Sequence, residues 1–160
     1  MPDWLEILLL VTATTGTGLV GGIFFAFSNF VMKALAQTPA TAGAEVMQRS
    51  NVTVLNPLFF TVFFGTGVIA LIVAVATPNV WNAPGAVLSR IAAALYLFGT
   101  LGVTIVRNVP LNEKLAITTL ADAALSPTWT HYLQAWTWWN HVRTIAALLA
   151  AALFAAAIAL

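Results

Sequence analysis

The stretch LEILLLVTATTGTGLVGGIFFAFSNFV (residues 5–31) decides the fold, because Glu6 is its only charged residue. A helix needs about 20 mainly apolar residues to cross a hydrocarbon core about 30 Å thick. The whole chain has the same character, since 61% of its residues are hydrophobic and 7% are charged, against about 25% charged in soluble domains. Too few charges remain to cover a soluble surface. The sequence therefore indicates an integral membrane protein.

Three more apolar stretches are long enough to span a membrane, at about residues 54–76, 87–106 and 142–160. They are continuously apolar rather than alternating, which excludes a membrane β-barrel. We predict an all-α, integral membrane four-helix bundle that forms a single domain over residues 1–160. The connection at residues 108–138 is expected to hold short helices, one of them starting at Ser126 and Pro127. Residues 44–50 are expected to form a short interfacial helix.

The basic residues predict an orientation. Arg90 lies toward one face, whereas the other five lie in or beside the connections after the first and third helices: Lys33, Arg49, Arg107, Lys114 and Arg143. Basic residues favour the cytoplasmic side, so we predict a multi-pass protein of the plasma membrane (the inner membrane in a bacterium). Both termini are then extracytoplasmic. The acidic start, with Asp3, differs from the basic start of a secretory signal peptide, so the first helix is expected to be retained.

Composition also excludes several classes of function. A formal net charge of +1 gives no basic field, which argues against nucleic-acid binding. The absence of cysteine excludes disulfides and thiolate chemistry. The bilayer is the predicted partner, and a homo-oligomer stays open because four helices make a thin bundle.

The polar residues of the spans gather at the predicted cytoplasmic face. They are Ser28, Asn29, Asn51, Asn56, Arg107, Asn108, Asn112, Glu113, Asn140, His141 and Arg143. Helical spacing predicts that Asn29, Asn56, Arg107, Asn140 and Arg143 point into the bundle. Taken singly, each is explained by helix capping, interhelical bonding or snorkelling. Their convergence from four helices favours a site, and Glu113 is expected to pair with Arg107 or Arg143.

Aromatic residues lie at the same level, among them Phe60, Trp136 and Trp139. Such rings serve packing and lipid contact, but they would also suit a flat polycyclic ligand. Two imidazoles and a carboxylate (His131, His141 and Glu113) could form a minimal iron site. The two histidines are ten residues apart on one predicted helix, which disfavours this site. We predict no metal and no cofactor, with haem or non-haem iron left open.

Five segments resemble the anthrone oxygenase family of small membrane proteins: FSNFVM (27–32), MQRSN (47–51), NPLF (56–59), RNVPLNE (107–113) and WNHVRT (139–144). The resemblance implies four membrane helices and, for the characterised members, oxidation of an anthrone to an anthraquinone by O2 without an established cofactor. It places the family's motif positions at Asn29, Asn51, Asn56, Asn108, Pro110, Asn112, Glu113, Trp139, Asn140 and Arg143.

The cluster of polar residues and the family resemblance together predict a membrane monooxygenase that oxidises a planar, apolar phenolic or anthrone-like substrate with O2. Glu113 or His141 is the expected base, and Arg143 and Asn140, with Asn56, are expected to stabilise the enolate oxygen. The expected substrate-binding residues are Asn29, Asn51, Asn56, Arg107, Asn108, Asn112, Trp136, Trp139 and Phe60. Whether the protein is an enzyme stays open. The alternative is a non-enzymatic membrane module for binding, transport or partner association.

Overall fold

The computed structural model describes residues 3–76, 84–121 and 123–160, and all regular structure within them is helical. The first rod consists of α1 (Asp3–Ala26), a π-helical segment η1 (Phe27–Val31) and α2 (Met32–Ala36). It is followed by α3 (Ala40–Thr53) and α4 (Pro57–Ala76). The second half holds α5 (Pro84–Ala94), the π-helical segments η2 (Leu95–Gly102) and η3 (Thr104–Asn108), α6 (Val109–Ile117) and α7 (Leu125–Ile158).

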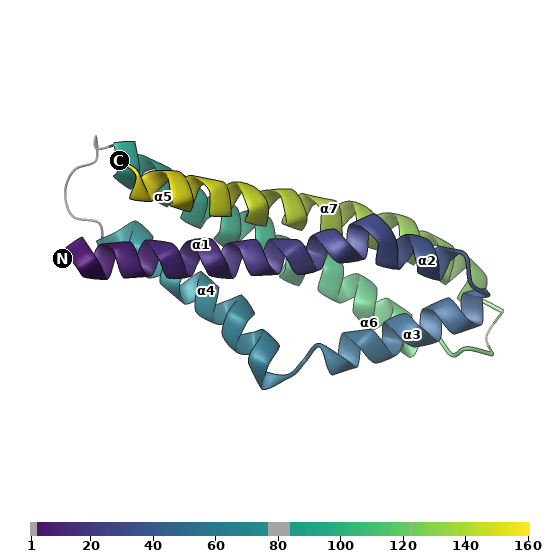
Figure 1. Ribbon diagram of the computed structural model, residues 1–160. Coiled ribbons are helices and arrows are strands. Elements are labelled where there is room, and N and C mark those ends of the chain that lie inside the picture. Colours follow the sequence, from purple (N-terminus) through teal and green to yellow (C-terminus); the bar gives the residue numbers. More distant parts are fainter. Residues whose placement is uncertain (1–2, 77–83, 122) are drawn as a thin grey trace.

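Four helical rods are long and apolar enough to cross a membrane, at Trp4–Ala36, Pro57–Ala76, Pro84–Ile117 and Leu125–Ile158. This confirms the predicted all-α class and the four spanning helices. The first and last rods run side by side, and α1 begins at the end of the bundle where α7 finishes (Figure 1). Residues 77–83, predicted as a turn, lie outside the described residues.

Two rods extend further than predicted. The third continues without a break through α6, and the fourth starts at Leu125 rather than near 142. The expected connection at residues 108–138 therefore contributes most of its length to these rods. Ser126 and Pro127 lie inside the first turn of α7, because the helix starts before them. The predicted interfacial helix at residues 44–50 is the centre of the longer α3.

The buried side chains form two clusters. The first lies between α1, α4, α5 and α7 and is rich in small residues, with Ala13, Ala147 and Ala150 fully buried. The second joins α2, α3, α6 and the first half of α7, and includes Met47 and Tyr132. Small side chains let membrane helices approach closely, whereas the second cluster is filled by larger side chains.

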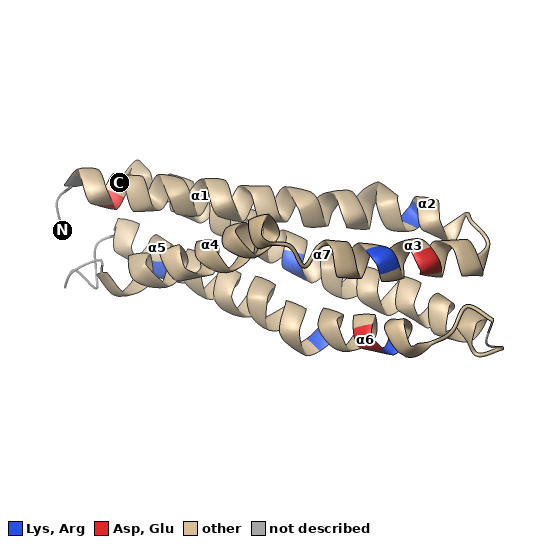
Figure 2. Ribbon diagram, turned by 90° about the horizontal axis from the view of Figure 1, so that it is seen from below, with Lys and Arg blue, Asp and Glu red and all other residues tan. Residues whose placement is uncertain are grey.

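The helices that hold the second cluster are longer than a membrane crossing requires. A helix of 34 residues such as α7 is about 51 Å long at about 1.5 Å per residue, against about 30 Å of hydrocarbon. Most charged residues lie toward the end that holds α2, α3 and α6 (Figure 2). We therefore expect this charged end to extend beyond the hydrocarbon as a continuation of the apolar helices.

Glycines mark the closest helix contacts, and Gly99 is the clearest. A Cβ atom on Gly99 would lie 2.6 Å from the Cβ of Ala146 in α7, whereas one on Gly22 would meet nothing within 4 Å. The side chain of Ala146 has no flexible end that could move aside. Relief of this contact would therefore have to move one of the two helices.

We expect Gly99→Ala to lower the free energy of unfolding by about 1–3 kcal/mol, the usual cost of overpacking. The matched Gly22→Ala should leave it unchanged or raise it by up to about 1 kcal/mol, through better helix propensity. Denaturation in mixed detergent micelles measures both. Equal stability of the two variants would contradict the close contact between η2 and α7.

Candidate functional site

Arg143 is a buried cation in the middle of the bundle, with 4% of its surface exposed. Its Nε and Nη2 atoms donate to Oδ1 of Asn140 at 3.1 and 2.5 Å, and Nη1 donates to Oγ1 of Thr104 at 3.2 Å. The guanidinium carbon lies 4.0 Å from the ring centre of Phe24 and 5.0 Å from that of Trp136. Both distances are within the range of cation–π attraction.

Asn140 joins the arginine to the first rod. Its Nδ2 atom donates to the backbone carbonyl of Phe24 at 2.6 Å and to the hydroxyl of Ser28. Asn140 is fully buried and Ser28 almost so. The orientation of the amide follows from these bonds, because its oxygen faces the guanidinium and its nitrogen faces α1. Asn140 thus links α1, α7 and the charge of Arg143.

No carboxylate neutralises this charge among the described residues. The salt bridge found there joins Arg49 to Glu45 at 2.7 Å, on the exposed side of α3. A buried ion normally needs an opposite charge or a full set of hydrogen bonds. The charge of Arg143 is instead stabilised by the two aromatic rings and by the neutral side-chain oxygens of Asn140 and Thr104.

A second polar group centres on Tyr132, which is 1% exposed. Its hydroxyl donates to Oδ1 of Asn112 at 2.8 Å and accepts from Nδ2 of Asn51 at 3.4 Å. The ring stacks between Trp129 and Trp136, with ring centres 5.7 and 5.9 Å away. These contacts connect α3, α6 and α7 and hold the amides of Asn51 and Asn112 in place.

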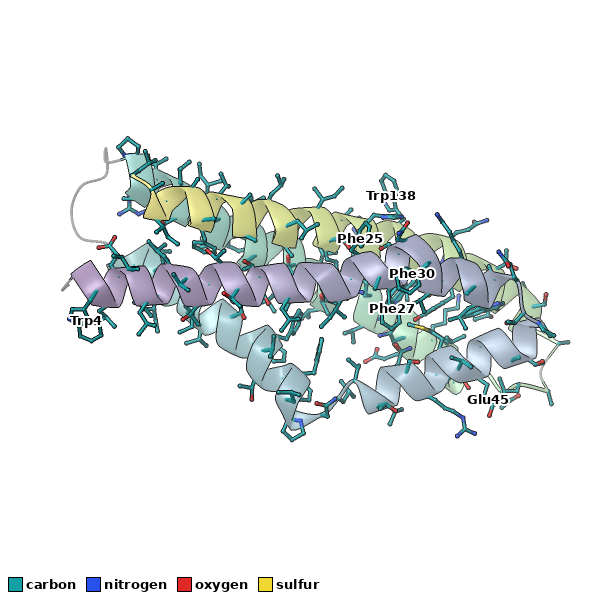
Figure 3. The ribbon with its side chains drawn as sticks, in the orientation of Figure 1. Trp4, Phe25, Phe27, Phe30, Glu45 and Trp138 are labelled. Carbon is teal, nitrogen blue, oxygen red and sulfur yellow. The ribbon has the colours of Figure 1, made fainter. Side chains whose placement is uncertain are left out.

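A cavity of about 180 Å³ lies between the two polar groups. Arg143, Thr104, Asn51 and Asn112 are among its polar lining residues. Aromatic rings supply much of the rest, from Phe24, Phe27, Phe59, Phe63, Phe64 and Trp136. Figure 3 shows Phe27 on the side of the first rod that faces α3 and α6, whereas Trp138 points away from the bundle. The cavity therefore combines flat apolar walls with one cation.

A second hollow, of about 700 Å³, lies between α1 and α4. It is more open, and its lining is aliphatic apart from glycine and threonine residues such as Thr12, Thr15 and Thr61. The hydroxyls of Thr12 and Thr15 bond to carbonyls of their own helix. This hollow offers no charged group, so the cavity beside Arg143 is the better candidate for chemistry.

The structure brings several predicted site residues together. Asn140, Arg143 and Trp136 share the buried face of α7 that the helical spacing predicted, together with Trp129. Asn108 is buried, and its Nδ2 atom donates to the carbonyl of Trp136 at 3.2 Å. Asn51 and Asn112 line the cavity.

Other predicted residues lie elsewhere. The prediction that Asn29 and Arg107 point into the bundle is wrong, because both are exposed and the adjacent Ser28 and Asn108 take the buried positions. Arg107 instead lies over the ring of Trp139, 4.7 Å from its centre. Trp139 is half-buried and is not among the cavity-lining residues.

The predicted inward position of Asn56 is also wrong. Asn56 is exposed and caps α4, where its Oδ1 atom accepts the N–H of Phe59 at 3.0 Å. Its side chain thus serves the start of the helix that it precedes. Phe60 is exposed and stacks on Phe64, with the ring centres 5.6 Å apart.

The two expected bases lie outside the cavity. Glu113 and His141 are both exposed, and neither is among the lining residues. The expected pairing of Glu113 with Arg107 or Arg143 is not found in the described part of the chain. Within the same residues, no three His, Cys, Asp or Glu side chains come close enough to hold a metal ion.

Three residues of this site, Tyr132, Thr104 and Phe24, are not among those predicted from the sequence. Tyr132 follows Trp129 by three residues and precedes Trp136 by four, so helical spacing would have placed it on the same face. Thr104 had no comparable signal, because η2 and η3 change the helical phase around it. Phe24 shares the buried face of the first rod with Ser28, whereas the prediction had placed Asn29 inward.

We expect Asn140→Ala to lower the free energy of unfolding by about 2–4 kcal/mol, since it removes two acceptor contacts of a buried cation and the bonds to α1. The matched His141→Ala changes the next, exposed residue of α7 and should shift it by less than about 0.5 kcal/mol. Denaturation in detergent micelles measures the difference. Similar stability of the two variants would contradict the linking role of Asn140.

The comparisons with known proteins give one match. The family model described as anthrone oxygenase matches residues 59–153, more than half of the chain. The matched segment holds most of α4, all of α5, the π-helical segments of the third rod, α6 and most of α7, with Asn108, Asn112, Asn140 and Arg143 among its residues. No curated protein and no solved structure matches the chain. The chain belongs to the anthrone oxygenase family.

Proposed function

We propose that this protein oxidises a planar, apolar phenolic or anthrone-like substrate with O2 in the cavity beside Arg143. The observation that carries the proposal is a buried guanidinium in the wall of an aromatic cavity, without a carboxylate partner among the described residues. Flat rings suit the phenylalanine and tryptophan walls. The cation suits an oxygen that becomes negative during the reaction.

The reaction balances with O2 as the oxidant. The substrate carbon opposite the carbonyl loses a proton, and the electron pair of that C–H bond makes the carbonyl an enolate. O2 then bonds to the electron-rich carbon. One oxygen atom stays there as the new carbonyl, and the other leaves as water with the two hydrogens that the carbon carried. No external reductant is needed.

The side chains around the cavity have distinct parts in this proposal. Arg143 stabilises the enolate oxygen, and Asn140 and Thr104 hold the guanidinium in position. The amides of Asn51 and Asn112 offer hydrogen bonds to a polar group elsewhere on the substrate. Since Glu113 and His141 lie outside the cavity, they could exchange protons only with groups at its exterior.

The proposal includes the orientation of the protein. The end that holds α2, α3 and α6 carries most of the basic residues (Figure 2), which supports a cytoplasmic location. Both termini are then extracytoplasmic, and the membrane is the plasma membrane. Residues 143–158 of α7 span about 22 Å at about 1.5 Å per residue, so Arg143 would lie within the hydrocarbon, near its cytoplasmic boundary.

Purified protein in lipid nanodiscs should speed the oxidation of anthrone above the protein-free rate, with one O2 consumed per anthraquinone formed. Arg143→Met should lower this acceleration about 100-fold or more, as loss of an oxyanion donor does. The matched Arg49→Met removes an exposed arginine of α3 and should keep the rate within about threefold. An oxygen electrode and the quinone absorbance measure both quantities.

Wild-type protein that gives no acceleration would refute the proposal and leave the non-enzymatic alternative. An Arg143→Met variant that is folded and as fast as wild type would refute the role of the guanidinium. Thermal unfolding of each variant in nanodiscs separates lost chemistry from lost structure.

The orientation can be tested with fusions. A reporter that is active only outside the cytoplasm should be active when fused after Leu160 and inactive when inserted between Thr38 and Pro39, ahead of α3. The charge distribution gives this expectation. The reverse pattern would overturn the proposed orientation without affecting the proposed chemistry.

A further inference from the structure

The hydrogen bonds of Arg143 leave part of its binding capacity unused. A guanidinium has five N–H donors, and three of them are engaged by Asn140 and Thr104. Two donors therefore have no acceptor in the described chain, although the residue is 4% exposed and lines the cavity. Unused donors on a buried charge mark a place where an acceptor is expected.

Trp136 provides a second, independent observation. Its Nε1 atom is buried and has no hydrogen-bond partner, and the residue is 4% exposed and lines the same cavity. Tryptophan N–H groups usually find an acceptor when they are buried. Two lining residues of α7 thus each have N–H donors without an acceptor in the described chain.

The charges around the cavity indicate the chemical class of that acceptor. Among the described residues that line the cavity, Arg143 is the only one with an ionisable side chain, and none carries a carboxylate or an imidazole. The site has a positive charge to neutralise and no side chain that would take a proton from a neutral ligand. An acceptor that arrives already ionised meets both conditions.

We infer that the cavity selects its ligand as a planar aromatic anion, an aryloxide, with Arg143 as its counter-ion. The inference rests on the proposed function and names the charge state in which the substrate is bound. The proton that the proposed reaction removes, from the C–H bond of a keto form or from the O–H bond of its phenol tautomer, is released to water before binding, and both give the same anion. No proton transfer inside the cavity is then required to form it. The bound anion is also the electron-rich form that reacts with O2.

The probe for this inference is 4-nitro-1-naphthol, whose phenol and phenolate forms differ in visible absorbance. Its methyl ether has the same ring system and cannot ionise. Wild-type protein in nanodiscs should bind the naphtholate about 10- to 100-fold more tightly than the ether, the factor expected for charge-assisted hydrogen bonds. At a pH equal to the pKa of the free probe, added protein should increase the phenolate absorbance.

Variants assign the preference to one residue. Arg143→Met should bring the two affinities to within about threefold of each other by weakening only naphtholate binding. The matched Arg49→Met should keep the preference, because that arginine lies outside the cavity lining. If Arg143→Met fails to fold, a pH series with wild-type protein still tests the inference. As the pH is lowered below the pKa of the probe, its apparent affinity must fall in proportion to its ionised fraction.

The outcomes separate this inference from the proposed function. Equal binding of ether and naphtholate by wild-type protein overturns the anion selection and leaves an aromatic cavity that accepts neutral substrates. Binding of neither probe overturns both. A naphtholate preference that survives in folded Arg143→Met overturns the assignment to Arg143.

Discussion

The burial of one guanidinium in a membrane-spanning helix is the constraint on which this structure depends. An arginine inside the hydrocarbon is expensive, and Arg143 lacks a carboxylate partner in the described chain. Its contacts come from three rods: Phe24 from the first, Thr104 from the third, and Asn140 and Trp136 from α7 itself. These three rods must therefore be in contact at the level of the Arg143 guanidinium.

The π-helical segments make this meeting possible. η1 begins just after Phe24, and η3 begins at Thr104, the arginine's partner in the third rod. A π segment inserts residues into a helical turn and changes which side chains face a neighbour. Asn108 thereby faces α7, whereas a regular period continued from Tyr96 and Thr100 would have turned Arg107 toward it. Such segments are frequent at functional sites, and two of the three here supply lining residues of the cavity.

Composition and helical period predicted the fold class, the four spanning helices and the inward face of α7. α7 is a regular α-helix from Leu125 to Ile158. A constant helical period therefore predicted correctly which side chains between Trp129 and Arg143 share its buried face. In the third rod the π segments alter the phase, and the prediction for Arg107 missed by one residue. In the first rod the buried face continues from Phe24 to Ser28 at regular helical spacing, so the prediction for Asn29 missed because the adjacent, exposed face was taken as the inward one. Hydropathy also ended the third helix too early and began the fourth too late, because the omitted ends are more polar although still helical.

The position of the cavity suits a ligand that comes from the bilayer. Val54 and Leu55, at the joint between α3 and α4, belong to its lining, together with three phenylalanines of α4. The small-residue cluster lies on one side of this level and the cluster of methionine and large aromatic side chains on the other. An apolar, neutral molecule partitions into the bilayer and reaches this boundary, whereas its anion is the form that Arg143 can hold. A single buried charge can thus turn a general affinity for flat rings into a preference for those that ionise.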